Sequence, residues 1–555
     1  MRILRENEEV RAPILSSLTR LIGSNMREKP SFSEAWLIGT GLGEEVEQYE
    51  IPGAKVSIRN SADGQVDYVM IPDEYRLERR DSELLRKVID EVSSRPPGPG
   101  IRPDRGYIHS KAREALNRLG VRANKDSGRA VADEERICSL AVRYTVGYGI
   151  LETLLEDPHI EDVYVDAPCD RNRVHVTVNG ISGFNSVVRC RSNIMLEPVE
   201  MDHLVSRLCR VSGLPFSETH PTLECDMGFK GARATAVGRP LSPAGTALAL
   251  RRHSSRPWTL TRMMRNGTLS AETAALISLM VDGRSTMMIC GPRGAGKSSL
   301  LSACLFEFPL SQRVLTLEDT RELPVETMQS MGYKVQSILA DDRNGESNER
   351  SRDALRLSLR MGESALVMGE VRGEEVSMLY EGMRTGRAGS TVLGTMHGES
   401  ALSLYERVVH DIGVSPEAFM ATDAIISLGL NRPRGSQRMR RGIREISEIG
   451  ERPGEFRSLI VNGDWAPDIL GSRTVSRIAS AWEMTGEEVM GNLKARRDMR
   501  SFLEEMGRDD EESLDPAWIR LANDHLSECM SRADMDPEEV SKSFEDMYRR
   551  RRGVD

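Results

Sequence analysis

A glycine-rich stretch near the middle of the chain has the residue types of a phosphate-binding loop. Residues 291–298 read GPRGAGKS and match G-x-x-x-x-G-K-[ST], in which glycines let backbone N–H groups turn toward phosphate oxygens. A short apolar run leads into the loop and a helix-like run, SSLLSACLFEF, follows it, as this pattern requires. We therefore predict a nucleotide site in which Lys297 reaches the β- and γ-phosphates and Ser298 binds Mg²⁺. The loop residues expected at the phosphates are Gly291, Pro292, Arg293, Gly294, Ala295, Gly296, Lys297, Ser298 and Ser299.

Acidic side chains and one imidazole follow three further apolar runs. Glu318 ends the run RVLTL, Glu370 follows ALVM and a glycine, and His397 ends TVLGTM. Glu322 lies four residues after Glu318. In an open parallel sheet, ligands bind beyond the carboxyl ends of the strands, so these side chains are expected at the same edge as the glycine-rich loop.

Phosphoryl transfer depends mainly on positioning and on charge neutralisation, and this assigns a role to each group. Glu370 is the candidate acid on the Mg²⁺ side. Glu318 and Glu322 are both candidates for activating the attacking water, and the sequence does not choose between them. His397 is either a sensor of the γ-phosphate or a structural histidine at the end of a strand.

Four arginines before the glycine-rich loop could supply further positive charge. Arg233, Arg239, Arg251 and Arg252 lie outside the region predicted to form the phosphate-binding sheet. In a ring of subunits they could reach a nucleotide across a subunit boundary, or they could be ordinary surface charges.

The pattern along the chain predicts the elements that must position these groups. Residues 270–450 alternate between strand-like and helix-like runs, which indicates a parallel sheet covered by helices. The strands are expected at residues 286–290, 314–317, 365–368, 391–396 and 424–430. Before this region, residues 150–253 have a mixed α and β pattern, and after about residue 470 the pattern is helical.

These changes of pattern divide the chain into four expected domains. Residues 1–105 form an extension of unknown role that ends in a Pro/Gly-rich linker, and residues 106–255 form an α+β domain. Residues 256–455 form the α/β core, and residues 456–555 form a helical extension in which capping patterns begin at Thr485 and Asp536.

The composition excludes several classes of protein. The 555 residues carry a net charge of −10, which argues against extensive nucleic-acid binding. No run is long and apolar enough for a membrane span, and we expect no signal peptide. The eight cysteines stand singly, which excludes a four-cysteine zinc module and favours reduced thiols in the cytoplasm.

Four ordered motifs together resemble the type II/type IV secretion ATPase family, especially its archaeal members. GPRGAGKSS is similar to the Walker A box of this family, and TLEDTRELPV (316–325) to its aspartate box. ALVMGEVRGEE (365–375) is similar to its atypical Walker B box, and GMRTGRAGSTVLGTMHGES (382–400) to its histidine box. The resemblance covers about residues 144–449, and the chain departs from the family where Arg387 stands in the usual TGH sequence.

The resemblance implies a RecA-like P-loop core preceded by a smaller, PAS-like α+β domain, with helical extensions. It further implies a cytoplasmic homohexamer that binds ATP and Mg²⁺ between its two lobes and docks on a polytopic platform protein at the cytoplasmic membrane. Such motors drive pilus assembly, archaellum assembly or protein export. By this analogy Glu318 or Glu322 activates water, Glu370 serves Mg²⁺, and Arg233, Arg239, Arg251 and Arg252 enter the nucleotide site.

Two other functions remain open. The same fold could move DNA, although the acidic composition makes a nucleic-acid partner the weaker expectation. Alternatively, the chain could be an assembly protein that binds ATP with little turnover.

Overall fold

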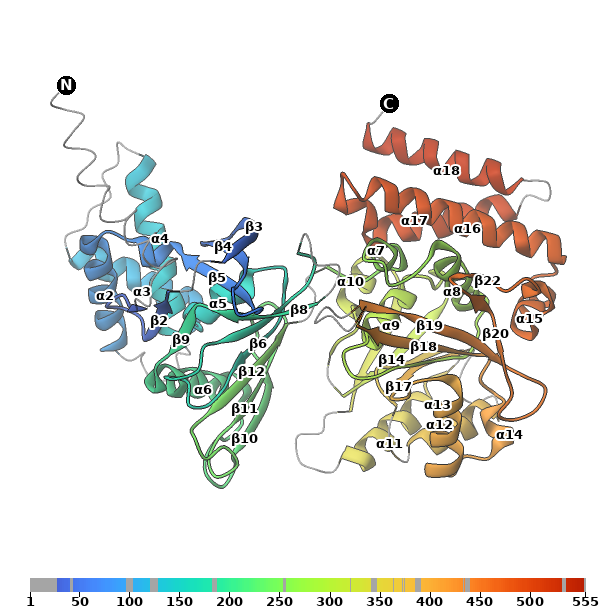
Figure 1. Cartoon of the computed structure of the whole chain (residues 1–555), viewed down its shortest axis with the longest axis horizontal. Coiled ribbons are helices and arrows are strands. Elements are labelled where there is room, and N and C mark those ends of the chain that lie inside the picture. The colour runs from blue at the N-terminus through green and yellow to red at the C-terminus, as the bar shows by residue number, and fades with distance from the viewer. Residues whose placement is uncertain are drawn as a thin grey trace. The chain divides into compact units, whose positions relative to one another are not determined.

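The computed structural model consists of two compact units, Met1–Ser255 and Arg256–Asp555 (Figure 1). The boundary between them coincides with one of the predicted boundaries. The structure describes residues 27–39, 43–95, 103–119, 128–181, 187–252, 256–319, 321–340, 347–362, 364–371, 373, 375–384, 391–432, 434, 440–531 and 536–553. Arg387 and most of the Pro/Gly-rich linker lie outside these residues.

The N-terminal unit contains a nine-stranded sheet in the order β10-β11-β12-β6-β7-β8-β5-β4-β3, and a three-stranded sheet in the order β1-β2-β9. The strands are β1 (Arg27–Glu28), β2 (Ala35–Ile38), β3 (Glu44–Ile51), β4 (Ala54–Asn60), β5 (Val66–Pro72), β6 (Ile160–Val165), β7 (His175–Val178), β8 (Val188–Ser192), β9 (Ile194–Leu196), β10 (Thr222–Asp226), β11 (Ala232–Val237) and β12 (Ala247–Arg252). The helices are α2 (Arg79–Ser93), α3 (Arg105–Arg118), α4 (Gly128–Thr145), α5 (Ile150–Glu156) and α6 (Pro198–Ser212).

One sheet crosses the boundary that the sequence predicts at residue 105. Strand β5 pairs in parallel with β8, and the Tyr68 hydroxyl donates a hydrogen bond to the buried Asp157 carboxylate at 2.6 Å. Val56 and Ile58 of β4 are fully buried in the same core as the strands after residue 150. The predicted extension 1–105 is therefore corrected, because its strands complete the core of the N-terminal unit.

The C-terminal unit is built on an eight-stranded sheet in the order β15-β14-β16-β17-β13-β18-β19-β20. Strands β13 to β18 are parallel, and β19 and β20 are antiparallel additions at one edge. The strands are β13 (Met287–Cys290), β14 (Arg313–Glu318), β15 (Lys334–Leu339), β16 (Ala365–Met368), β17 (Thr391–Met396), β18 (Ala424–Asn431), β19 (Arg440–Ile449) and β20 (Phe456–Ser458), with a separate hairpin of β21 (Ile460–Val461) and β22 (Asp464–Trp465). This arrangement confirms the predicted α/β core with a parallel sheet.

Helices cover both faces of this sheet. Alternate residues of β13 enter opposite cores, so Met287 and Ile289 pack on one face and Met288 and Cys290 on the other. Figure 1 shows α7 and α8 on one side and α11 to α14 on the other. The helices are α7 (Leu260–Arg265), α8 (Ala271–Asp282), α9 (Lys297–Leu305), α10 (Val325–Ser330), α11 (Ser347–Ser358), α12 (Glu375–Arg384), α13 (Ala401–Glu406), a π-helix η2 (Arg407–Asp411) and α14 (Pro416–Phe419).

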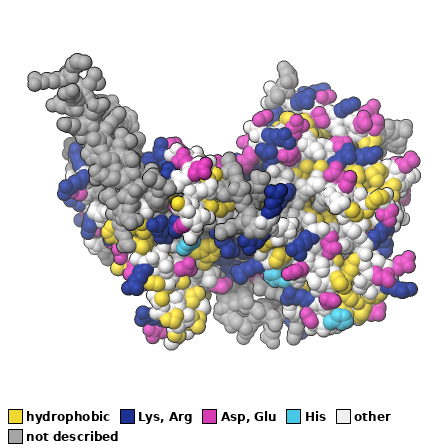
Figure 2. All heavy atoms as spheres, in the orientation of Figure 1, with side chains coloured by type: hydrophobic (Ala, Val, Ile, Leu, Met, Phe, Trp, Pro, Cys, Tyr) yellow, Lys and Arg dark blue, Asp and Glu magenta, His cyan; other side chains and the backbone are white. Residues whose placement is uncertain are grey.

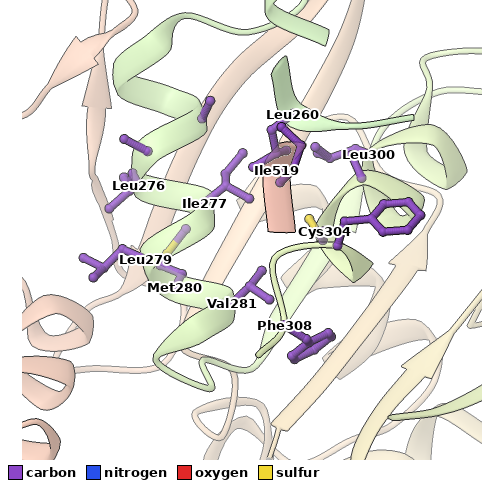
Figure 3. Close-up of a cluster of buried hydrophobic side chains, with 14 of the residues drawn as sticks. Leu260, Leu276, Ile277, Leu279, Met280, Val281, Leu300, Cys304, Phe308 and Ile519 are labelled. Carbon is purple, nitrogen blue, oxygen red and sulfur yellow. The ribbon is translucent and has the colours of Figure 1, made fainter. Parts of the chain in front are cut away.

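The C-terminal helices belong to the same unit, so the boundary predicted at 455/456 is also corrected. They are α15 (Arg473–Ala481), α16 (Gly486–Met506), α17 (Pro516–Met530) and α18 (Pro537–Arg552). Thr485 and Glu488 form the predicted capping box of α16, and Asp536 caps α18 ahead of Pro537. Their apolar faces enter the core beside α8 and α9, where Figure 3 shows Ile519 of α17 among Leu260 and Leu300.

Among the residues that the structure describes, no helix has the length and apolar character needed to cross a membrane.

Candidate active site

The glycine-rich loop joins the end of β13 to the start of α9. Gly294 and Gly296 have φ angles of +80° and +94°, in the left-handed region that glycine adopts without strain. A Cβ atom at Gly291 would lie 2.8 Å from the Leu428 carbonyl oxygen of β18, so only glycine fits there. The Lys297 ammonium donates to the carbonyl oxygens of Gly291 and Pro292 at 3.0 and 3.1 Å, within its own loop. Ser298 and Ser299 lie in the first turn of α9, whose N-terminus favours an anion.

The parallel register brings the carboxyl ends of four strands to the same edge as this loop. Cys290 pairs with Met396, and Met368 pairs with both Leu317 and Gly394. Glu318, Glu370 and His397 therefore lie at one edge of the sheet, as predicted from their positions after apolar runs.

Glu318 is the buried acid of this edge. Its side chain accepts hydrogen bonds from the backbone N–H groups of Glu322 and Leu323 at 2.8 and 2.9 Å, and the residue is 3% exposed. Burial raises the pKa of the Glu318 carboxyl from 4.5 to about 7, against the lowering effect of the two backbone hydrogen bonds. A carboxyl whose pKa lies near neutrality can take a proton from a reacting water and return it.

Two neighbouring residues, Gly369 and Glu322, explain why the Glu318 carboxyl is buried and hydrogen-bonded. Gly369 presents no side chain to Glu318, since a Cβ there would lie 3.2 Å from the Glu318 Cγ. Glu322 is only partly buried, and its backbone N–H, rather than its side chain, holds the Glu318 carboxylate.

Glu370 and His397 form a pair beside the loop. The His397 Nε2 lies 3.3 Å from the Glu370 Oε1, and both side chains are partly exposed. Burial, followed by the positive charge of Lys297, lowers the pKa of the His397 imidazole, while Glu370 opposes this shift. The lowered pKa favours the neutral imidazole, which can donate or accept a hydrogen bond at a phosphate. Arg407 of η2 donates to the His397 carbonyl oxygen at 3.3 Å.

The four predicted arginines lie in the N-terminal unit, on β11, on β12 and in the loop between them. Arg233 pairs with Glu224 at 2.9 Å and lies opposite Arg251 in the sheet register. Arg252 donates to the Asp157 carbonyl oxygen, and Arg239 precedes a cis proline. Their contribution to the nucleotide site stays a prediction.

Sequence reasoning missed two polar residues of β19, one that contacts the phosphate-binding loop and one that contacts elements beside it. The Arg441 Nε donates to the Gly294 carbonyl oxygen of the loop at 3.0 Å. Glu445 accepts hydrogen bonds from Ala401 and Ser427. Both lie in the run RRGIREISEI, whose alternation of polar and apolar residues near its end was the available signal for a strand.

The fold and this edge define a P-loop α/β protein with two acids and a histidine beside its phosphate-binding loop. Residues 232–441 match the family model described as "Type II/IV secretion system protein". This part of the chain, which contains the phosphate-binding loop and the candidate acids, is therefore similar to type II/type IV secretion system proteins.

Individual relatives are distant. An uncharacterized protein of Methanocaldococcus jannaschii is 26% identical over 292 residues, which cover 52% of this chain and 50% of that protein. The type IV secretion system protein PtlH of Bordetella pertussis is 25% identical over 199 residues, covering 32% of this chain and 58% of that protein. This chain thus spans about half the length of these relatives. The structure of the Legionella pneumophila ATPase DotB aligns with a TM-score of 0.40 at 18% identity, over 62% of this chain and 88% of DotB.

Proposed function

We propose that the chain is an ATP-hydrolysing motor of a type II/type IV-like secretion or pilus-assembly system. The observation that carries this proposal is the position of Glu318, a buried acid with a pKa near neutrality at the sheet edge that holds the phosphate-binding loop. A protein that only binds nucleotide has no need of a buried base at this edge.

Each residue of the edge has a role in the proposed reaction. Lys297 neutralises the β- and γ-phosphates, and the backbone of residues 291–299 holds them. Of the two candidate bases, we propose Glu318, because its carboxyl group is the buried one and the Glu322 backbone orients it. His397 contacts the γ-phosphate and, through its contact with the Glu370 carboxylate, couples the position of that side chain to the bound phosphate.

Ser298 and Glu370 would hold Mg²⁺. A hydroxyl and a carboxylate are the hard oxygen donors that this ion prefers, and it keeps several water ligands besides. When bound, Mg²⁺ would neutralise the charge that develops on the transferred phosphoryl group.

The resemblance to this family supports a proposal for the larger assembly. We propose a homohexameric ring in which Arg233, Arg239, Arg251 and Arg252 bring positive charge to the nucleotide. The ring would act in the cytoplasm, on a polytopic platform protein at the membrane. On the face that Figure 2 shows, acidic and basic side chains are mixed over the C-terminal unit. A mixed surface of this kind favours a protein partner over nucleic acid.

Steady-state ATP hydrolysis, measured with Mg²⁺ over a range of protein concentrations, tests the proposal. Turnover per subunit should rise with concentration if the site is completed on assembly. Lys297→Ala and Glu370→Gln should each lower kcat by about a hundredfold or more, as loss of a transition-state charge partner does. Lys334→Ala is the matched control, because Lys334 is exposed and starts β15 at the opposite edge of the same sheet.

The result also separates the two alternatives. ATP binding without hydrolysis at any concentration would refute the motor and favour a nucleotide-gated assembly protein. Hydrolysis that duplex DNA stimulates in a salt-sensitive way would instead favour a DNA-translocating motor.

A further inference from the structure

Glu445 of β19 joins three elements around the phosphate-binding loop. Its Oε1 accepts a hydrogen bond from the backbone N–H of Ala401 at 2.7 Å and another from the Ser427 hydroxyl at 3.1 Å. Ala401 is the first residue of α13, so its N–H has no partner within the helix. A carboxylate at this position is stabilised by the positive end of the helix dipole.

Through Ser427, the carboxylate reaches the strand that carries the loop. Ser427 lies opposite Cys290 in the pairing of β18 with β13, and its hydroxyl is 3.2 Å from the Cys290 sulfur. Cys290 is the last residue before Gly291. The register of the pairing between β18 and β19 shifts between Ser427 and Leu428. The carbonyl oxygen of Leu428 is the atom that leaves no room for a side chain at Gly291. Irregularities of this kind re-aim strands next to active sites.

Through Ala401, the same carboxylate holds the segment that carries His397. Ser403 accepts hydrogen bonds from the backbone N–H groups of Glu399 and Ser400, both at 2.9 Å. These local bonds fix the shape of the turn from His397 to Ala401. The bond from Ala401 to Glu445 joins this turn to the sheet.

We propose that Glu445 is a positioning residue for hydrolysis, which anchors the start of α13 to β18 and thereby holds His397 beside Glu370 and the loop. This inference rests on the proposed function, because it assigns Glu445 to the hydrolytic step. Glu445 acts through His397 and does not touch the nucleotide.

The same strand supplies a matched control. Glu448 is buried, and its Oε2 accepts from the Ser472 hydroxyl at 2.6 Å and from the Thr474 backbone N–H at 3.0 Å. It therefore anchors the start of α15 as Glu445 anchors the start of α13. Glu448→Ala should lower the melting temperature and leave kcat unchanged.

A double-mutant cycle of kcat tests the coupling between Glu445 and His397. Glu445→Ala should lower kcat about tenfold in the wild-type background, since small displacements of catalytic groups cost one to two orders of magnitude. The same substitution should cost less than about twofold when His397 is already alanine, because residues that act as one unit are not additive. Glu445→Gln keeps the accepting oxygen and should retain at least about half of kcat.

A second measurement does not depend on hydrolysis. In protein with ¹³C-labelled histidine, the His397 Cε1–Hε1 signal, assigned from the spectrum of His397→Ala, should move in Glu445→Ala and stay in place in Glu445→Gln and Glu448→Ala. Equal losses of kcat in both backgrounds, or a His397 signal that Glu445→Ala leaves unmoved, would overturn the inference. If the wild-type protein does not hydrolyse ATP, the proposed function fails by that result, and the histidine signal alone then decides whether Glu445 positions His397.

Discussion

Replacing Glu318 by glutamine should abolish ATP hydrolysis. It should also remove the loss of folding stability that wild type undergoes as the pH rises. The Glu318 carboxyl is 3% exposed, and burial raises its pKa from 4.5 to about 7. Glutamine keeps an oxygen that can accept from the Glu322 and Leu323 N–H groups but carries no titrating proton. The substitution therefore isolates the cost of ionising this buried group.

The sign and size follow from proton linkage. Because the folded protein holds the proton more tightly than the unfolded chain, the stabilising contribution is fully present below pH 4.5 and is lost as the pH rises to about 7. A shift from 4.5 to about 7, at about 1.4 kcal/mol per unit, corresponds to a loss of about 3 kcal/mol. Glu318→Gln does not undergo this loss, so its stability relative to wild type should rise by about 3 kcal/mol between about pH 4.5 and pH 7.5.

Scanning calorimetry of both proteins at about pH 5 and about pH 8 measures this difference. In the C-terminal unit, about 3 kcal/mol corresponds to a change in melting temperature on the order of 5 °C. Between the lower and the higher pH, the melting temperature of Glu318→Gln relative to wild type should rise by this amount. A difference in melting temperature that is the same at both pH values would refute the raised pKa, and with it the reason for choosing Glu318 as the base. The turnover of wild type should also rise as the pH passes through about 7, since a base must be ionised to accept a proton.

Three further substitutions test the frame around the site. Gly291→Ala places a Cβ atom 2.8 Å from the Leu428 carbonyl oxygen and should weaken ATP binding at least about tenfold by calorimetry; unchanged affinity would show that the loop relaxes freely. Arg500→Met leaves the Glu307 carboxylate buried without its cation and should cost about 3–5 kcal/mol in urea unfolding, most of which the double variant Arg500→Met/Glu307→Gln should recover. Thr485→Ala removes the capping box of α16 and should cost about 1 kcal/mol in the same assay, whereas a cost near zero would mean that tertiary packing alone fixes this helix end.

The parallel strands could be predicted from sequence because burial on both faces makes them short, continuous apolar runs. Strand β16 is the run ALVM, and all four residues are buried. Strand β15, at the sheet edge, is the run KVQSIL, in which exposed and buried positions mix, and it was missed. An edge strand lacks the continuous apolar run of its neighbours. Strand β15 is therefore identified only by its pairing with β14 in the structure.

The error at the N-terminus has a different cause. Strand β5 alternates weakly and ends in a proline, and its parallel partner β8 lies more than a hundred residues away in the chain, by the register of Val66 with Cys190. Local pattern contains no information about such a pairing. The buried hydrogen bond from Tyr68 to Asp157 makes the same point, because neither residue type indicates a partner at that separation.

The positions of the candidate site residues could be predicted from the sequence, and their electrostatics could not. The ends of β14, β16 and β17 fixed where Glu318, Glu370 and His397 lie, since parallel strands deliver their following residues to one edge. The raised pKa of Glu318 depends on its burial beside Gly369 and below the Glu322 turn, which are tertiary facts. The proposal of Glu318 rather than Glu322 as the base therefore rests on the structure and not on the sequence.

The helices after residue 456 are part of the frame that holds the phosphate-binding loop. Glu307 follows the end of α9, and its carboxylate accepts from Arg500 of α16, from Asn523 of α17 at 3.0 Å and from Ser278 of α8 at 2.7 Å. Arg500 and Glu307 are both fully buried, so a movement of α9 that left α16 in place would separate an ion pair inside the core. Because separating this buried pair is costly, we expect a displacement of α9 to carry α16 and α17 with it. We therefore expect the C-terminal helices to influence the candidate nucleotide site mechanically, although they lie far from the phosphate-binding loop in the sequence.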